Sequence, residues 1–176
     1  MAEYQYAEHG FGPVYDSRSR LLILGSFPSV KSREEGFFYG HPRNRFWRVL
    51  SALLRTAEPH SAEEKRAMLL ANQIAVYDVI ESCRILGSSD SSIRDVVPAD
   101  LSAIIHTSQI KAIFVNGKTA GKLYRKFQEP ETGIPAVELP STSPANAAVS
   151  LERLIQIWGQ AFASCGMDSV PHMKNN

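Results

Sequence analysis

The residues best able to do chemistry are concentrated in one stretch, Gly25 to Arg43, directly after the apolar run Leu21 to Leu24. Three consecutive aromatic residues in a loop are costly to leave in water, so we expect Phe37 and Phe38 to pack beneath the helix that follows. Tyr39 stands beside glycine and His-Pro, and this setting suits a platform on which a nucleobase stacks, an interaction worth about 1–3 kcal/mol per base. Aromatic, proline and basic residues share this stretch: Phe27, Pro28, Phe37, Phe38, Tyr39, His41, Pro42 and Arg43.

Asn44 follows this stretch and is predicted to open a helix whose apolar face carries Phe46 to Leu54. Asparagine is among the best N-caps, and the residue type alone favours that structural role. The alternative is that its amide points into a pocket, where it would orient a water molecule or hydrogen-bond the edge of a base.

The segment Leu139 to Asn146, LPSTSPAN, is predicted to lead from the last strand into the last helix. Ser143 would be the N-cap and Pro144 the first helical residue. A helix N-terminus rich in hydroxyl groups can also bind phosphate through its free N–H groups and its dipole. The two roles are compatible.

Two strand ends give weaker signals. Asp78 either places a carboxylate at the mouth of a site or caps the turn that follows. The Asn116-Gly117-Lys118 turn is not a phosphate-binding P-loop, because Ala112 stands where that motif requires glycine.

Composition excludes several classes of function. The five histidines show no metal-ligand spacing, and Cys83 and Cys165 belong to no CxxC pattern, so we expect neither a metal nor another cofactor. No apolar run approaches the roughly 18 residues of a membrane helix, and no secretory signal opens the chain. We therefore expect a cytoplasmic protein of bacterial or archaeal type with no membrane partner.

The net charge of the chain is +1, but residues 31–55 hold six basic and two acidic side chains. This segment could face phosphates or simply be a solvated helix face.

The elements that must position these residues alternate between strand and helix. The pattern predicts a three-layer α/β/α sandwich with a four-stranded, mainly parallel sheet. We expect a single domain of residues 1–176, with a core at about 11–164 and a flexible tail at 165–176. Ligands of such sheets bind beyond the carboxyl ends of the strands. The predicted strands are Leu21 to Leu24, Ile74 to Tyr77, Ile110 to Val115 and Ala136 to Leu139. Further helices are predicted at Ala62 to Asn72, Ala99 to Thr107 (opened by Pro98) and Gly117 to Phe127, and the last helix carries an apolar stripe from Leu151 to Phe162.

Three segments together resemble the uracil-DNA glycosylase superfamily: Gly25 to Ser29, Phe37 to Trp47 (FFYGHPRNRFW) and Pro140 to Asn146. The resemblance extends from about Phe11 to Phe162. Most members place a catalytic Asp or Asn where this chain has Phe27, which argues against classical uracil excision. The pattern is similar to that of the hypoxanthine-DNA glycosylase branch, in which an Asn further along the first signature is implicated in catalysis. That residue corresponds to Asn44.

The resemblance also implies the remaining site residues. The base would be bound by Ser26, Phe27, Tyr39, Asp78 and Ser143, and DNA would be bound by Lys31, Ser32, Arg43, Ser141, Pro144, Ala145 and Asn146. The loop holding Pro144 would push into the base stack, although Ala145 is smaller than the leucine usual in the family.

The implied function is monofunctional hydrolysis of the N-glycosidic bond of deaminated bases, chiefly hypoxanthine, after base flipping. The implied partners are DNA containing deaminated bases and downstream abasic-site repair enzymes, and the protein would act as a monomer. Two alternatives stay open: a mismatch-directed uracil-DNA glycosylase, and a non-catalytic binder of damaged DNA. A Rossmann-type nucleotide enzyme is disfavoured because no GxGxxG follows a strand.

Overall fold

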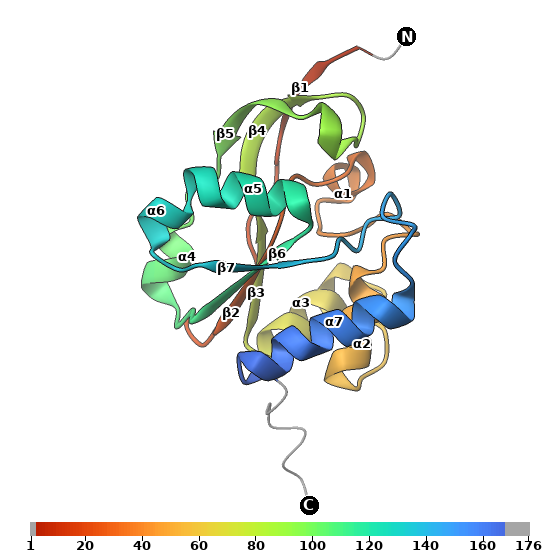
Figure 1. The fold of residues 1–176 in the computed structure, drawn as a ribbon, viewed down its shortest axis with the longest axis vertical. Helices are drawn as coiled ribbons and strands as arrows, with labels where there is room; N and C mark the ends of the chain where they lie inside the picture. Colours follow the sequence, from red (N-terminus) through yellow and green to blue (C-terminus); the bar gives the residue numbers. More distant parts are fainter. Residues whose placement is uncertain (1–2, 168–176) are drawn as a thin grey trace, which may run out of the picture.

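The computed structural model describes residues 3–167, and its centre is a sheet of four parallel strands (Figure 1). The strands follow the order β3-β2-β6-β7, and each pairing is parallel. Their bounds are Leu21–Gly25 for β2, Ile74–Asp78 for β3, Ala112–Asn116 for β6 and Ala136–Leu139 for β7. The predicted four-stranded sheet is confirmed, within a residue or two at each end.

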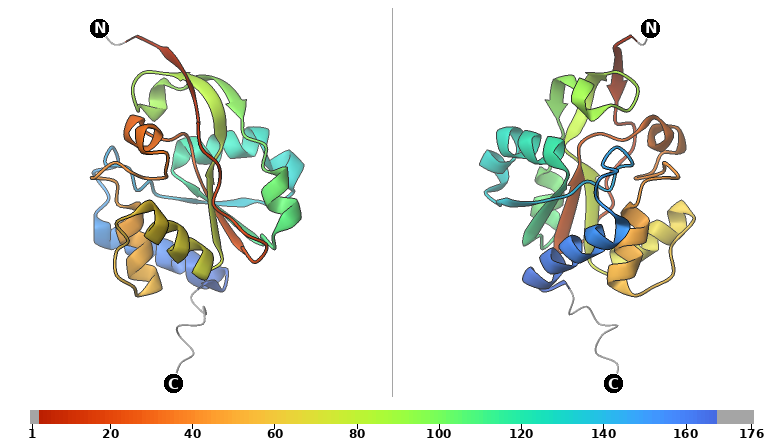
Figure 2. Two further views of the ribbon diagram at one scale, coloured as in Figure 1. Left: turned by 180° about the vertical axis from the view of Figure 1, so that it is seen from behind. Right: turned by 45° about the vertical axis from the view of Figure 1, so that its right-hand side comes forward.

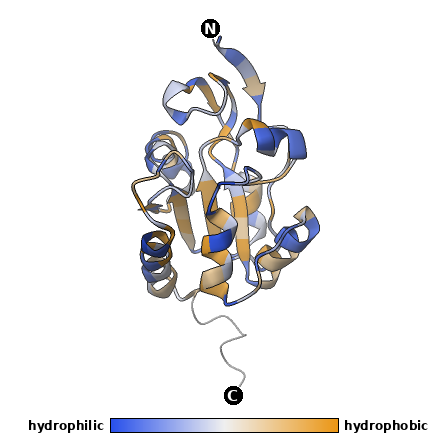
Figure 3. Cartoon of the chain, turned by 90° about the vertical axis from the view of Figure 1, so that its right-hand side faces the viewer, coloured by the Kyte–Doolittle hydropathy of each residue, from blue (hydrophilic) through white to orange (hydrophobic). Residues whose placement is uncertain are grey.

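Helices cover both faces of this sheet, which confirms the three-layer arrangement (Figures 1 and 2). Alternation along β2 sends Leu21 and Ile23 into one hydrophobic cluster and Leu22 and Leu24 into the other. The first cluster lies under α2 (Phe46–Leu54), α3 (Ala62–Ala71) and α7 (Leu151–Ser164), and the second under α4 (Ser102–Thr107) and α5 (Lys118–Phe127). Figure 3 shows the hydrophobic strands enclosed at the centre.

A second, antiparallel sheet was not predicted. It comprises β1 (Gln5–Glu8), β4 (Ile80–Ile85) and β5 (Arg94–Pro98), in the order β1-β4-β5. Its strands are short, carry exposed polar residues, and are irregular in the β4–β5 register, so they lack the apolar runs of the central sheet. The turn between β4 and β5 holds a short 3₁₀ helix, Asp90–Ser92, which lies at the same end of the molecule as the loops after the parallel strands.

Two predicted helix starts are wrong. Pro98 ends β5, and α4 begins at Ser102, because the Ala99 N–H is bonded to the carbonyl of Val79, the residue between β3 and β4. The last helix begins at Leu151 with Ser150 as its N-cap, whereas Ser143 and Pro144 belong to a non-helical loop. Two short helices complete the chain, α1 (Val30–Glu35) in the long loop after β2 and α6 (Glu129–Thr132).

The packed core extends beyond the predicted bounds of 11–164. Ala7 and Met167 are both buried, and Met167 belongs to the cluster under α7. Residues 168–176 of the predicted flexible tail lie outside the described residues, so the mobility of the tail stays a prediction. In the described part of the chain, none of the helices combines the length and the apolar character needed to cross a membrane.

Candidate active site

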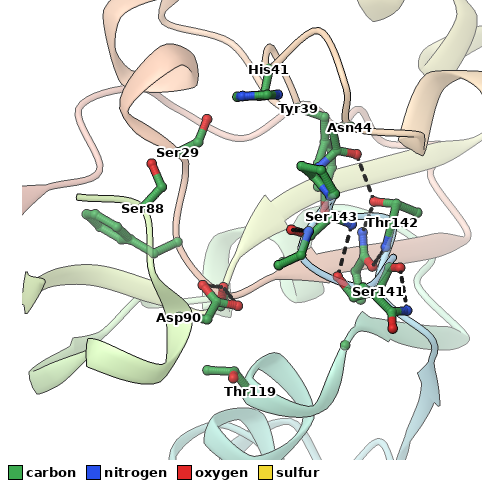
Figure 4. Close-up of a pocket in the computed structure, with 18 of the residues that line it drawn as sticks. Ser29, Tyr39, His41, Asn44, Ser88, Asp90, Thr119, Ser141, Thr142 and Ser143 are labelled. Carbon is green, nitrogen blue, oxygen red and sulfur yellow. Dashed lines mark hydrogen bonds between the residues drawn. The ribbon is translucent and has the colours of Figure 1, made fainter. Parts of the chain in front are cut away.

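A cavity of about 1030 Å³ opens at the carboxyl ends of the parallel strands (Figure 4). Its walls come from the long loop after β2, the β6–α5 junction, the loop between β7 and α7, and the β4–β5 turn. The two stretches that carry the sequence signals thus meet across one cavity, large enough for a nucleotide. It is lined by eleven of the thirteen predicted site residues: Ser26, Phe27, Ser32, Tyr39, Asn44, Asp78, Ser141, Ser143, Pro144, Ala145 and Asn146. Lys31 and Arg43 are exposed and lie outside its lining.

Asn44 is held by its amide oxygen. The N-cap of α2 is Arg45, so the prediction that Asn44 itself caps the helix is wrong by one residue. Its Oδ1 accepts hydrogen bonds from the Phe46 N–H and from the Thr142 hydroxyl, both at 2.9 Å. A backbone N–H can only donate, so the Phe46 bond fixes which amide atom is oxygen. The side chain's other polar atom, Nδ2, is a donor on a residue that lines the cavity.

Thr142 and Asn116 hold this orientation from behind. The buried Thr142 hydroxyl accepts a hydrogen bond from Asn116 Nδ2 at 3.0 Å and donates its own hydrogen bond to Asn44 Oδ1. The Thr142 N–H donates in turn to Asn116 Oδ1 at 3.0 Å, which fixes the Asn116 amide as well. Neither residue was predicted as part of the site. Asn116 was noted only as the end of a strand, and Thr142 only as one letter of the serine-rich segment.

Tyr39 lies on the cavity wall in a strained conformation. Its backbone has φ of 54°, a left-handed value that is uncommon for a bulky side chain and costs on the order of 1–3 kcal/mol. One face of its ring stacks on Phe46, with centroids 4.0 Å apart and planes at 15°. Its hydroxyl is buried without a hydrogen-bond partner among the described residues, and burial, followed by the nearby Asp78 carboxylate, raises the pKa of Tyr39.

Gly25 permits the close packing of Tyr39 and Asp78 at the end of β2. A Cβ at Gly25 would lie 2.5 Å from Asp78 Oδ1 and 2.9 Å from the Tyr39 hydroxyl, which are distances that real Cβ atoms do not show. Any other residue would push these two side chains away from the end of the strand.

Asp78 is paired with His9, a residue that sequence reasoning missed. His9 Nε2 and Asp78 Oδ2 are 2.7 Å apart, and both side chains are buried. His9 follows β1, in the sheet that was not predicted, and packs against Phe11 and Tyr77. The pair leaves Asp78 Oδ1 beside Gly25 on the cavity floor.

Asp90 also lines the cavity and was not predicted from the sequence. It comes from the turn between β4 and β5, and the Ser26 hydroxyl lies 2.9 Å from both of its carboxylate oxygens. Desolvation by the surrounding protein raises the pKa of Asp90, the nearby Asp78 carboxylate adds to this effect, and the Ser26 hydrogen bond opposes it.

Two arginines of the basic segment are engaged within the protein instead of facing solvent. Arg45 donates to the carbonyls of Ser143, Asn146 and Val149, and thereby clamps the loop that precedes α7. The Arg33 guanidinium lies 5.2 Å from the centre of the Phe27 ring. Phe27 itself is mostly buried and contributes an apolar patch to the cavity wall.

The helix N-terminus at the cavity belongs to α5 and not to the last helix, contrary to prediction. Gly117, Lys118 and Thr119 line the cavity, whereas Ser150 and Leu151 do not. Gly117 has φ of 101°, a backbone conformation that favours glycine, and a Cβ there would approach the Ser141 Cβ to 3.1 Å and press on the neighbouring loop.

Comparisons with known proteins identify relatives of this chain by sequence and by fold. The sequence model of the uracil DNA glycosylase superfamily matches residues 12–161. A hypoxanthine DNA glycosylase from Methanosarcina acetivorans is 33% identical over 148 residues, which is 83% of this chain and 92% of that protein. A hypoxanthine DNA glycosylase from Methanosarcina barkeri is 31% identical over 157 residues, or 88% of this chain and 98% of its own length. The solution NMR structure of a candidate uracil DNA glycosylase from M. acetivorans superposes with a TM-score of 0.77 at 31% identity, covering 92% of this chain and 99% of that one.

Proposed function

Because this chain belongs to the uracil DNA glycosylase superfamily, we propose that it is a monofunctional DNA glycosylase that removes deaminated bases, chiefly hypoxanthine, from DNA. The observation that carries the proposal is the fixed amide of Asn44. Its oxygen is occupied by two donors, and its nitrogen is left as a donor in a cavity of nucleotide size.

The substrate reaches the cavity by leaving the base stack. Extrusion costs a few kcal/mol and is cheapest for a mispaired base, and hypoxanthine formed from adenine pairs poorly with the thymine opposite. Tyr39 offers the extruded base a stacking surface. Because Phe46 covers one face of the Tyr39 ring and holds it in place, the other face is the one available to the base.

Asp78 supplies the means to tell a deaminated base from adenine. Hypoxanthine, xanthine and uracil each carry a ring N–H next to a carbonyl, whereas the matching ring nitrogen of adenine has a lone pair. His9 occupies one Asp78 oxygen, and the other oxygen accepts the ring N–H of the deaminated base. Adenine would instead set its lone pair against the carboxylate, which is repulsive. Ser26, Ser143 and the Phe27 ring complete the surroundings of the base.

Asn44 acts on the bond that breaks. Scission of the N-glycosidic bond leaves negative charge on the departing purine, and the Asn44 Nδ2 donor stabilises that charge. Preorganised donors of this kind contribute about 10²–10³ in kcat. The Asn44 oxygen cannot also accept a proton from water while Thr142 and Phe46 occupy it, so the geometry favours stabilisation of the leaving group over activation of water.

DNA contacts surround the cavity. Exposed Lys31 and Arg43 are placed to meet phosphates, and exposed Ala145, beside Pro144, forms the part of the second loop that enters the stack. The other three predicted contacts, Ser32, Ser141 and Asn146, shape the loops from within: the Ser32 hydroxyl accepts the Gly40 N–H, and Asn146 Nδ2 donates to the Ser141 carbonyl. The resulting abasic DNA would pass to abasic-site repair enzymes, and a monomer suffices for each step.

The test is to incubate the purified chain, in the presence of a chelator, with duplexes that carry one deoxyinosine, uracil or xanthine. The proposal expects release of hypoxanthine, alkali-sensitive breaks at the inosine site, and no break without alkali. Faster release of uracil than of hypoxanthine would establish the mismatch-directed alternative. A shifted duplex without abasic product would establish a non-catalytic binder, and would refute the enzyme.

A further inference from the structure

Among the described residues that line the cavity, Asp90 is a carboxylate that can still bind a ligand and that has no role in the function proposed above. The titratable side chains that line the cavity are Tyr39, His41, Asp78, Asp90, Lys118 and Glu138. Asp78 is tied to buried His9, and Glu138 pairs with Arg125 at 3.2 Å. The Nδ1 atom of His41 accepts the Arg43 N–H.

Asp90 differs from these groups in its hydrogen bonding. Its partner, the Ser26 hydroxyl, has a single proton and satisfies one carboxylate oxygen at a time, although both oxygens lie 2.9 Å away. A carboxylate can accept about four hydrogen bonds, so Asp90 can accept further hydrogen bonds from water. Figure 4 shows Asp90 extending into the cavity from the side facing Ser141 and Ser143.

Hydrolysis of an N-glycosidic bond needs a group of this type. The sugar develops positive charge as the base departs, and the attacking water must lose a proton. An amide such as Asn44 carries no charge that would stabilise the positive sugar, and it does not accept a proton from water at neutral pH. The site therefore has a donor for the leaving group but still requires an anionic acceptor on the sugar side.

Resting on the glycosylase function proposed above, we infer that Asp90 is a further catalytic residue, which binds the attacking water and stabilises the positive charge at C1′, and that Ser26 is its positioning residue. In this reaction the C1′–N9 bond breaks and its electron pair leaves on the purine. The water oxygen forms the new bond to C1′, one water proton passes to the Asp90 carboxylate and then to solvent, and the purine takes a proton from solvent. Water and the damaged nucleotide are consumed, and no other reactant is needed.

The surroundings of Asp90 suit a proton acceptor. Ser26 and Asp78 act on the Asp90 carboxylate, and Asp90 in turn acts on Tyr39 and on Cys83, which Arg33 also influences. Lys118 lines the same cavity. Desolvation and the Asp78 charge raise the pKa of Asp90 above that of a free aspartate, which makes the carboxylate a stronger base.

The experiment measures single-turnover release of hypoxanthine as a function of pH, together with binding of a duplex whose inosine sugar carries a 2′-fluoro group and resists cleavage. Asp90→Asn should slow release by about 100-fold or more, because general-base assistance contributes 10²–10⁴. Its affinity for the fluoro duplex should stay unchanged or rise, since a negative charge has been removed near DNA. The acid limb of the rate profile should disappear in Asp90→Asn, and Asp90→Glu should restore part of the rate.

Two further variants separate a catalytic role from a structural one. Ser26→Ala removes the hydrogen bond that lowers the pKa of Asp90, so its acid limb should move to higher pH. Asp95→Asn makes the same change of charge in β5, at an exposed residue paired with Arg84 outside the cavity, and should retain the wild-type rate and profile.

Asp90→Asn with the wild-type rate, or with the acid limb intact, would overturn the inference while leaving the glycosylase function in place. Parallel loss of rate and of fluoro-duplex affinity in Asp90→Asn would also overturn it, by showing that Asp90 merely shapes the cavity. A wild-type protein that releases no base from any duplex would overturn the inference and the proposed function together.

Discussion

Replacing Asn44 with Asp separates the roles that this residue could have. A carboxylate keeps an oxygen to accept the Phe46 N–H and the Thr142 hydroxyl, so the loop stays anchored. It cannot donate, so the hydrogen bond to the departing purine is lost, and its charge opposes the charge that develops there. We expect excision of hypoxanthine to fall by about 10²–10³, the effect of removing one preorganised donor.

The same variant has different consequences under the competing explanations. If Asn44 serves only to fix the start of α2, aspartate is as good a partner for a backbone N–H and activity should persist. If Asn44 orients water through its oxygen, aspartate should do this at least as well, because it is the stronger acceptor. Asn44→Ala cannot make the distinction, since it also removes two hydrogen bonds that each contribute about 0.5–1.5 kcal/mol to stability.

The assay is single-turnover excision from an inosine duplex, with thermal unfolding as the control for folding. Asn44→Asp should unfold near the wild-type temperature, and Asn44→Ala below it. An Asn44→Asp protein that excises hypoxanthine at the wild-type rate would refute the donor role and return Asn44 to a structural one.

Three further predictions follow from the described contacts. Tyr39→Ala should weaken binding of an inosine duplex by about 1–3 kcal/mol, roughly 5- to 150-fold, whereas Tyr39→Phe keeps the ring on Phe46 and should bind as the wild type does in the same titration. Arg45→Met keeps the apolar stem but releases carbonyls of the loop before α7, including that of Ser143, and should cost about 1–3 kcal/mol in denaturant unfolding and lower the excision rate. Because the pKa of Asp90 is raised in the folded protein, its charge costs stability at neutral pH and costs none once it is protonated in both states. Asp90→Asn should therefore raise the melting temperature at neutral pH, and the gain should vanish as pH falls toward about 4.

The parts of the fold that could be predicted are the elements whose own sequence carries a clear pattern. Strands buried on both faces read as continuous apolar runs, so Leu21–Gly25 and its neighbours were recognisable, and the parallel order placed the site at their carboxyl ends. The β1-β4-β5 sheet has no such runs. The Ser143-Pro144 pair is a genuine helix-start signal, but Ser150 caps α7 instead, and Arg45 binds the carbonyls of the intervening loop. The local preference of Ser143-Pro144 for a helix start is therefore overridden by the tertiary contacts of Arg45.

The parts of the site that could not be predicted depend on pairs of residues far apart in the chain. Asn44 and Thr142 are 98 residues apart, His9 and Asp78 are 69 apart, and Ser26 and Asp90 are 64 apart. The type of each residue indicates which bonds it can form, but only the fold decides which partner it meets. Asn44 could be proposed from its resemblance to a signature, whereas the assignment of its amide oxygen and nitrogen required the positions of Phe46 and Thr142.

The distribution of donors and acceptors in the cavity follows the charge separation that bond scission creates. In the proposed reaction the departing purine becomes negative, and Asn44, on the long loop after β2, would offer it the Nδ2 donor, while the N-terminus of α5 opens on the same cavity. The sugar becomes positive, and Asp90 approaches from the antiparallel sheet. Hydrogen bonds hold both side chains in place before the substrate arrives. Preorganisation of this kind makes fixed dipoles and charges effective. The small second sheet thus has a role beyond packing, because the turn between β4 and β5 adds Asp90 to the carboxylates that the parallel strands bring to the cavity.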